Sequence, residues 1–362
     1  MSISSNDLAY LSKVSLDDYL RNKAIDNISV NTPLLKKLSA KKKTLVGGRQ
    51  NVVVNIRKSH DSNFAWTYGE ASVGFNRRYT TDQAAFPWRV AVDGFYIPHD
   101  YLFGNGVEVR EGERGAFRLE KAEKNQLLDL MEEQTSAFTA GFLEKYSLEL
   151  HRDGTAGADA ITGLDGLITT APGTGTVGGI DRSTSPYWRN SAFTDIAYWQ
   201  EGFLAQAMEA AWRECIRAGG GSDSPDLILA GSAFVDAYRQ YAITVTNNAN
   251  AGSVKRLDAG VGTGVNTGLY FKGVEILWDP QFSVLDALDA PDIPWEQRCY
   301  FLNTKFIELR DDGLDVVTPT RPYNVRALYQ MIKLRTALVM KRSNAHAVLS
   351  LGTLPEPSAP DI

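Results

Sequence analysis

Several residue types and patterns that define common protein classes are scarce in this chain of 362 residues. The only cysteines, Cys215 and Cys299, are far apart and belong to no C-x-x-C pair. We therefore expect neither a disulfide framework nor a structural zinc site, and we expect the protein to be made in a reducing cytoplasm. No run of 18 or more apolar residues occurs, which predicts no transmembrane helix. The first residues also lack the charged-then-apolar pattern of a signal peptide.

Signatures of catalysis are missing as well. No H-E-x-x-H, G-x-S-x-G or G-x-x-x-x-G-K-[ST] sequence occurs. None of the histidines lies near a cysteine or another histidine: His60, His99, His151 and His346. The chain offers no group of nucleophile, base and orienting residue. We predict no catalytic residue, no metal ligand, no cofactor and no enzymatic activity.

One string resembles a nucleotide-binding motif. Gly173–Gly178 spells G-x-G-x-x-G, and such a loop needs a strand before it and an amphipathic helix after it. Residues 164–170 are compatible with a short strand. Residues 179–186 are polar, contain a proline and lack helical spacing of apolar residues. The context favours a flexible loop followed by a turn at 186–188, and a nucleotide-binding enzyme is the minor alternative.

Charge is distributed unevenly along the chain. Residues 1–60 contain eleven lysines and arginines and four acidic residues, a formal charge of +7. Because the whole chain carries −5, the remainder carries −12. A basic arm of this kind is often simply solvated, but it can also bind nucleic acid or the acidic body of a neighbouring copy.

The N-terminal third predicts an arm followed by an extended hairpin. Residues 1–45 are too polar for a core of their own and predict one or two short helices, interrupted at Asn31–Pro33. Residues 51–58 are rich in β-branched residues and predict a strand, and residues 88–98 predict the strand that returns. The polar segment between them forms the predicted tip.

The predicted tip contains large aromatic residues that it cannot bury by itself. They are Phe64, Trp66, Tyr68, Phe75 and Tyr79. Exposed apolar clusters usually mark a partner surface, and Arg77 and Arg78 beside them suit bidentate pairing with carboxylates. The alternative is that this segment folds back onto its own domain.

The strongest helical pattern runs from Ala116 to about His151, roughly 50 Å at the α-helical rise. A second helix is predicted for Ser191–Arg217, a buried strand for 226–230 and a third helix for Ala233–Tyr241. Later strands are predicted as follows: 269–278, 299–309, 314–318, 327–341 and 346–351. The last two are predicted to form a hairpin through 342–345.

This order of elements resembles the major capsid protein of tailed bacteriophages, with its Hong Kong 97-type fold. The resemblance rests on four segments of the sequence: GLDGLITTAPGTGTVGGIDRSTSPYWRN (163–190), PDLILAGSAFVDAYRQ (225–240), FKGVEILWDP (271–280) and RCYFLNTKFIELR (298–310). It extends over the whole chain.

The resemblance implies an α+β fold with a specific division. Residues 1–45 are the N-terminal arm and 46–105 the extended β-hairpin loop with its base. Residues 106–152 and 311–362 are the peripheral domain with the long spine helix, and 153–310 are the α/β axial domain. Gly173–Gly178 then belongs to a loop in which glycines allow close backbone passage.

The implied function is a structural shell protein that assembles in the host cytoplasm and resides in the virion. Its implied partners are itself in pentamers and hexamers, a separate scaffolding protein, a portal, a decoration protein and packaged double-stranded DNA. No membrane is involved. The predicted contacts between copies use Lys41, Lys42, Lys43, Arg57, Phe64, Trp66, Tyr68, Arg77 and Arg78.

Two further points follow from the resemblance. Some family members cross-link a lysine of the extended loop to a neighbour, but here only Lys58 lies in that region, near its base, so we do not expect this chemistry. An encapsulin-like cellular compartment on the same fold remains the structural alternative.

Overall fold

The computed structural model describes most of the chain. The described residues are 31–44, 50–60, 62–68, 75, 77–98, 100, 110–111, 117–118, 121–200, 202–219, 223–249, 266–317 and 327–353. They mix helices and strands, which confirms the α+β class. The chain divides into two compact units: the first contains the described residues of 90–146 and 313–335, and the second contains those of 31–89, 147–312 and 336–353.

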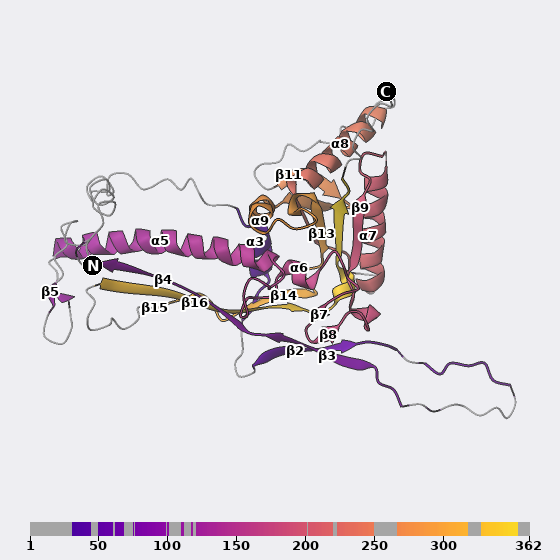
Figure 1. Ribbon diagram of the computed structural model, residues 1–362, viewed down its shortest axis with the longest axis horizontal. Helices are drawn as coiled ribbons and strands as arrows, with labels where there is room; N and C mark the ends of the chain where they lie inside the picture. Colours follow the sequence, from indigo (N-terminus) through magenta and orange to yellow (C-terminus); the bar gives the residue numbers. More distant parts are fainter. Residues whose placement is uncertain are drawn as a thin grey trace, which may run out of the picture. The chain divides into compact units, whose positions relative to one another are not determined.

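The first unit consists of a long helix and a small sheet (Figure 1). Its elements are β4 (Arg89–Pro98) from Val90 on, β5 (Arg110–Glu111), β6 (Phe117–Arg118), α5 (Lys121–His151) up to Tyr146, β15 (Asp315–Val317) and β16 (Ala327–Met340) up to Arg335. β16 pairs with β4 and, antiparallel, with β15. α5 lies on this sheet, since the rings of Phe138 and Phe95 are 4.8 Å apart and Thr135 donates a hydrogen bond to Gln330 over 2.8 Å.

The long helix predicted from the sequence is confirmed over 31 residues, about 46 Å at the α-helical rise. Its predicted start at Ala116 is wrong because Phe117–Arg118 is strand β6. In the part whose side chains are described, Phe142 and Tyr146 are buried.

The second unit is built on a six-stranded sheet. Its strands, in spatial order, are β11 (Asn266–Phe271), β12 (Val274–Trp278), β10 (Leu227–Ala230), β13 (Arg298–Leu302), β17 (Ala347–Leu351) and β9 (Ser191–Ile196). The helices around it are α7 (Phe203–Gly219), α8 (Ser232–Ala249), α9 (Gln281–Asp289), η2 (Trp295–Gln297) and η3 (Ser343–Ala345). Figure 1 shows α7 alongside β9, which it contacts together with β13 and β17.

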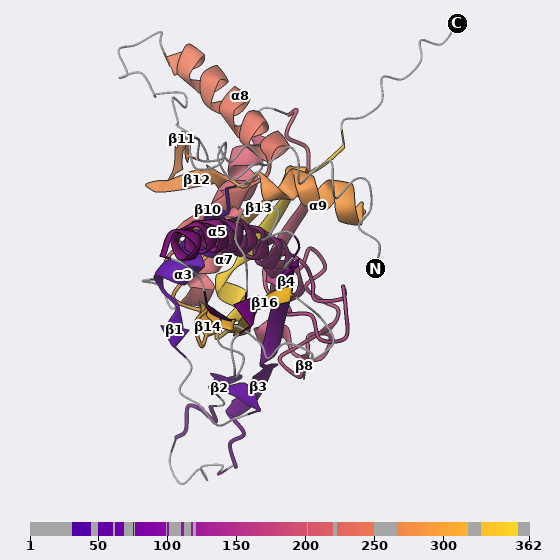
Figure 2. The same cartoon turned by 90° about the vertical axis from the view of Figure 1, so that its left-hand side faces the viewer.

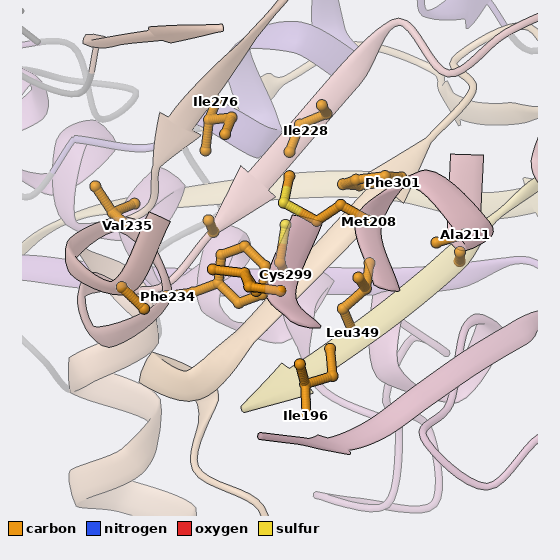
Figure 3. Close-up of a cluster of buried hydrophobic side chains, with 14 of the residues drawn as sticks. Ile196, Met208, Ala211, Ile228, Phe234, Val235, Ile276, Cys299, Phe301 and Leu349 are labelled. Atoms are coloured by element: carbon orange, nitrogen blue, oxygen red, sulfur yellow. The ribbon is translucent and has the colours of Figure 1, made fainter. Parts of the chain in front are cut away.

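Helices cover both faces of this sheet, so its central strands are buried along their whole length. Cys299 and Phe301 of β13 face the cluster drawn in Figure 3. Tyr300, between them, faces the opposite side, where its ring lies 6.1 Å from that of Phe282 in α9. The labelled cluster in Figure 3 joins α7, α8 and the strands: Ile196, Met208, Ala211, Ile228, Phe234, Val235, Ile276, Cys299, Phe301 and Leu349.

The remaining elements of the second unit are short. They are α3 (Pro33–Ala40), β1 (Lys43–Thr44), β2 (Asn51–Arg57), β3 (Thr81–Pro87), α6 (Leu164–Leu167), β7 (Thr176–Val177), β8 (Ile180–Asp181), η1 (Pro186–Trp188) and β14 (Ile307–Asp311). β14 pairs with β1 in parallel and with the end of β16 in an antiparallel ladder. No helix in the described part of the chain combines the length and apolar character needed to span a membrane.

The predicted interruption at Asn31–Pro33 is the start of a helix. Pro33 stands in the first turn of α3, where its missing N–H leaves no bond unmade. Leu34, Leu35 and Leu38 on this helix are buried. The rest of the predicted arm up to residue 30 lies outside the described residues.

The extended hairpin is confirmed, but its returning strand is misassigned by the sequence. β2 pairs with β3 from Asn51 opposite Pro87 to Arg57 opposite Thr81. The predicted return at 88–98 is β4, which pairs with β16 instead. The polar sequence of β3, TDQAAFP, obscures the strand, and only its register opposite β2 defines it.

Three other expectations are corrected. Residues 191–196 of the predicted second helix form strand β9, and helix α7 begins only at Phe203. The predicted strand at 164–170 contains helix α6. The predicted late hairpin is absent, because β16 pairs with β14 and β17 pairs with β13 and β9 in a different sheet.

Candidate functional site

The tip of the β2–β3 hairpin exposes the aromatic residues that the sequence singles out. The exposed fractions are 75% for Phe64, 92% for Trp66, 100% for Tyr68, 93% for Phe75 and 62% for Tyr79. Because they are exposed, the alternative in which this segment folds back and buries them against its own domain is wrong. Figures 1 and 2 show the described parts of the loop extending away from the β2–β3 pair.

The aromatic residues of the tip make only small contacts with one another. The rings of Phe64 and Trp66 meet edge to face at 5.3 Å, and the guanidinium of Arg77 lies 5.0 Å from the centre of the Tyr79 ring. Arg57 and Arg78 are also exposed, and neither forms an ion pair with another described residue. The tip therefore presents apolar rings and cations to solvent, the composition of a contact surface.

The lysine run after α3 is placed differently. Lys41 Nζ lies 2.8 Å from Asp226 Oδ2, Lys42 Nζ 3.3 Å from Asp311 Oδ1, and Lys43 Nζ 2.8 Å from Glu308 Oε1. The parallel pairing of β1 with β14 brings Lys42 and Lys43 to Asp311 and Glu308 of β14. The three lysines thus contact their own chain, and a role between copies stays a prediction.

Glu308 is the centre of this cluster. Its carboxylate accepts hydrogen bonds from Lys43 and Lys341, and Arg310 lies 3.4 Å away. Burial alone would raise the pKa of Glu308, but the hydrogen bonds from Lys341 and Lys43 hold it below its usual value. The same balance of burial and hydrogen bonds, from Lys41 and Thr304, lowers the pKa of Asp226.

The G-x-G-x-x-G string forms a tight turn beside the hairpin. Gly178 and Gly179 join β7 to β8 with φ values of +60° and +81°, as a two-residue hairpin turn requires. The Gly178 carbonyl accepts a hydrogen bond from Ala85 N over 2.8 Å. A Cβ at Gly178 would lie 2.9 Å from that of Ala84. Gly178 therefore allows the turn to pack closely against β3, whereas Gly179 is required only for its positive φ.

This geometry gives no support to a nucleotide site at Gly173–Gly178. The string leads into a two-stranded hairpin rather than into a helix whose N-terminus could face a pyrophosphate. Trp188 in η1 is buried, and its Nε1 donates to Val177 O over 3.0 Å. The predicted turn at 186–188 is therefore confirmed, and it fixes this hairpin in place.

The described residues also contain no group of three or more side chains arranged to hold a metal ion. His60 is exposed, and His151 and His346 are buried in separate places, while His99 lies outside the described residues. Cys215 and Cys299 are both buried as free thiols, and burial raises the pKa of Cys215 to about 12.

The sequence analysis does not predict several buried polar side chains that the structure contains. Arg298 in β13 bonds Asp165 of α6 over 2.9 Å and lies on the Trp295 ring. Arg182 is buried and donates to the carbonyl of Leu167, and burial lowers its pKa to about 10. His151 contacts Asp279 with both side chains fully buried. Their partners are up to 133 residues away in the chain, so no local pattern indicates them.

Comparison with known proteins gives a clear result only at the level of structure. No model of a known protein family matches the chain, and no curated protein sequence matches it. Among solved structures, the chain is similar to one in the capsid asymmetric unit of cyanophage A-1(L), with a TM-score of 0.61 and 18% identity over 92% of this chain and 97% of that one.

Two further phage structures match over nearly the whole chain. The capsid of the myovirus XM1 gives a TM-score of 0.57 at 12% identity, covering 97% of this chain and 99% of the other. The structure of Mycobacterium phage Adephagia gives 0.51 at 12% identity, covering 98% and 100%. The chain therefore has the fold of these phage structures, and the first two of them are capsids.

Proposed function

We propose that this chain is the major capsid protein of a tailed bacteriophage and that copies of it assemble into the icosahedral head shell around the phage DNA. The observation that carries the proposal is the likeness to phage capsid chains over nearly the full length of both partners. An inserted catalytic domain would have left a large unmatched region, and the coverage leaves little room for one. The protein accordingly acts as a structural component of the virion.

The proposal includes the Hong Kong 97-type division of the chain. Residues 1–45 are the arm, 46–105 the extended hairpin loop and its base, 106–152 and 311–362 the peripheral domain, and 153–310 the axial domain. The long helix α5 supports a peripheral domain that contains 121–151, and the five strands of the six-stranded sheet that lie within 153–310 support the axial domain. Strand β17 (Ala347–Leu351) belongs to the same sheet, so the sheet does not support its place in the peripheral domain. The β2–β3 pair with its exposed tip supports the second.

We assign the hairpin tip to contacts between copies. Phe64, Trp66 and Tyr68 are too exposed to stabilise a single copy. A buried aromatic side chain removes about 150–250 Å² from water, worth about 25 cal/mol for each Å² of apolar surface. Arg57, Arg77 and Arg78 add cations suited to carboxylates on an acidic neighbour. A shell repeats such a contact in every copy.

The lysine run has two available roles in an assembled shell. Lys41, Lys42 and Lys43 bind carboxylates of their own chain, yet their side chains remain about half exposed, by 59%, 46% and 57%. Each ammonium has three donors, so a second acidic group from a neighbouring copy can bind beside the first. We propose this contact as secondary to the tip, because exposed ion pairs are weak and screened by salt.

Further partners follow from the proposed role. Assembly in the host cytoplasm uses pentamers and hexamers of the chain, a scaffolding protein and a portal, and a decoration protein can bind the finished shell. DNA contacts the inner face without sequence specificity.

Sedimentation velocity of the full chain, alone and with its scaffolding protein, tests the proposal. We expect rings of five or six copies or closed particles, in at least one of the two conditions. A species no larger than a dimer in both conditions, at all concentrations, would contradict it.

A further inference from the structure

Strand β2 has one edge with which no other described strand pairs. β2 pairs only with β3, from Asn51 to Arg57, in a continuous register without a bulge. An isolated two-stranded ribbon is marginally stable in water, whereas three or more strands with a buried face are stable. The second edge of β2 is therefore where this ribbon can gain a further strand.

The hydrogen bond that follows the ladder shows which backbone groups of β2 point toward the free edge. Lys58 N donates to Thr80 O over 2.9 Å, so these two residues form a hydrogen-bonded pair. Such pairs alternate along an antiparallel ladder, so the even-numbered residues of β2 bond to β3. The N–H and C=O groups of the odd-numbered residues point outward: Asn51, Val53, Asn55 and Arg57. These backbone groups have no hydrogen-bond partner in the part of the chain that the structure describes.

The outer edge of β3, in contrast, is protected by its own chain. Ala85 N donates to Gly178 O over 2.8 Å, and Gln83 N donates to Asp82 Oδ1 over 2.9 Å. Pro87 has no N–H to offer. Natural proteins protect exposed edges by such covering contacts, by proline, by bulges and by charges within the strand. The sequence of β2, NVVVNIR, contains no proline and a charge only at its last residue, so this edge remains open to another strand.

The outward groups of β2 match those of a second β2 strand that runs antiparallel to it. A twofold axis at Val54 places Asn51 opposite Arg57 and Val53 opposite Asn55. Every outward residue then meets an outward residue, whereas a shift by one residue would place it against a residue already bonded to β3. The two arginines lie about 20 Å apart at opposite ends of the pair, so no like charges face each other.

We propose that β2 is a docking strand for β2 of a second copy, and that the two ribbons join into a four-stranded antiparallel sheet about a twofold axis. Each hydrogen-bonded pair exchanges two bonds, so the contact forms about eight backbone hydrogen bonds. The contact uses a different surface from the aromatic tip and needs only two copies. It goes beyond the proposed function, and it is compatible with an icosahedral shell because such a shell contains twofold axes.

Disulfide trapping of the full chain with oxidised glutathione tests the pairing and its register. Val54→Cys places two thiols in a non-hydrogen-bonded pair with Cα atoms about 4.5 Å apart, a separation that a disulfide can span. Asn51→Cys is the matched control, because its two thiols would lie about 20 Å apart. Cys215 and Cys299 are buried and do not compete. Val54→Cys should form linked dimers at least about tenfold faster than Asn51→Cys.

A second pair of variants tests the free edge without a cysteine. Val53→Pro removes an outward N–H of β2 and leaves the hydrogen bonds to β3 in place. Thr81→Pro is the matched control, because it removes an outward N–H of β3 instead. In sedimentation equilibrium, Val53→Pro should raise the dissociation constant of the dimer by about tenfold, since two hydrogen bonds are lost. Thr81→Pro should change it by less than about twofold.

Equal rates of cross-linking for the two cysteine variants would overturn the pairing, and so would a Val53→Pro chain that dimerises as the wild type does. A loss of assembly in Val53→Pro without linked dimers of Val54→Cys would assign the edge to a different strand and would overturn the twofold contact as well. Shells that form without linked dimers contradict this inference alone. Linked dimers that never form rings or shells, even with a scaffolding protein, support this inference and contradict the proposed function.

Discussion

Aromatic side chains are buried around the six-stranded sheet and exposed in the hairpin tip. In the sheet region, Trp212 of α7 is 6% exposed and packs edge to face on Phe301, with ring centres 6.1 Å apart. In the tip, Trp66 and Tyr68 are almost fully exposed. The sheet region buries its aromatic side chains within its own chain, whereas the tip leaves them exposed. Under the proposed function, a neighbouring copy covers the tip.

The largest effect on stability is expected in the sheet region. Phe301→Ala would leave a cavity between α7 and β13, where Phe301 has no exposed surface. Substitutions of this kind cost about 3–5 kcal/mol. Urea denaturation followed by tryptophan fluorescence measures the change. A loss below about 1 kcal/mol would show that the cluster is loosely packed. It would contradict the statement that the sheet region is tightly packed within its own chain.

The buried His346 makes the free energy of unfolding of the sheet region fall at acidic pH. Its Nδ1 accepts from Asn303 N over 3.2 Å, and burial lowers its pKa to about 4. A lowered histidine pKa contributes stability that is present above the unfolded value of about 6.5 and is lost as pH falls toward 4. The contribution at neutral pH is about 3 kcal/mol.

The pH profile of urea denaturation between 7 and 4 tests this fall. The wild-type chain should lose stability more steeply than His346→Asn, whose side chain does not gain a charge. His60→Asn is the control, because His60 is exposed. Parallel profiles for all three chains would contradict the assignment.

A smaller effect is expected at the junction of hairpin and turn. Gly178→Ala introduces a Cβ at φ +60° and at 2.9 Å from the Ala84 Cβ, and we expect a loss of about 1–3 kcal/mol. Gly173→Ala is the matched control, since no atom lies within 4 Å of its added Cβ and its φ is not positive. It should change stability by less than about 0.5 kcal/mol. Equal effects of the two variants would show that the turn does not pack on β3.

The smallest effect on stability, and the largest on assembly, is expected in the tip. Trp66→Ala should change the free energy of unfolding by less than about 0.5 kcal/mol, because the side chain is 92% exposed. The yield of particles in sedimentation should fall sharply. Trp66→Phe should retain part of it, since an aromatic ring remains. Normal assembly of Trp66→Ala would show that the tip is not required for contacts between copies.

The sequence predicts the long helix, the hairpin and its exposed aromatic residues because these depend on local periodicity and on a surplus of apolar residues. The sequence does not predict which strands pair when the paired residues are far apart in the chain. β16 and β17 follow each other with only a short turn between them, yet enter different sheets. Residues 191–196 pair in parallel with β17, more than 150 residues away, and the chain bends at Asp195 with φ +58° before α7 begins.

Features of the candidate site can likewise be predicted where they depend on local sequence, and cannot where they depend on distant residues. Exposure of the tip residues could be predicted, because a short polar segment has no core in which to bury them. The acidic partners of Lys41–Lys43 lie 185 to 269 residues away and could not be predicted. The residues after the G-x-G-x-x-G string lack helical spacing, and the structure likewise places the β7–β8 hairpin and the turn at 186–188 there instead of a helix.

Electron cryo-microscopy of particles assembled from the full chain tests the central claim most directly. The account predicts closed shells with fivefold and sixfold clusters of copies, in which Trp66 and Tyr68 are buried against a neighbouring copy. Particles in which both side chains face solvent would contradict the role of the tip. A chain that forms no rings, sheets or shells, even with its scaffolding protein, would contradict the capsid assignment itself.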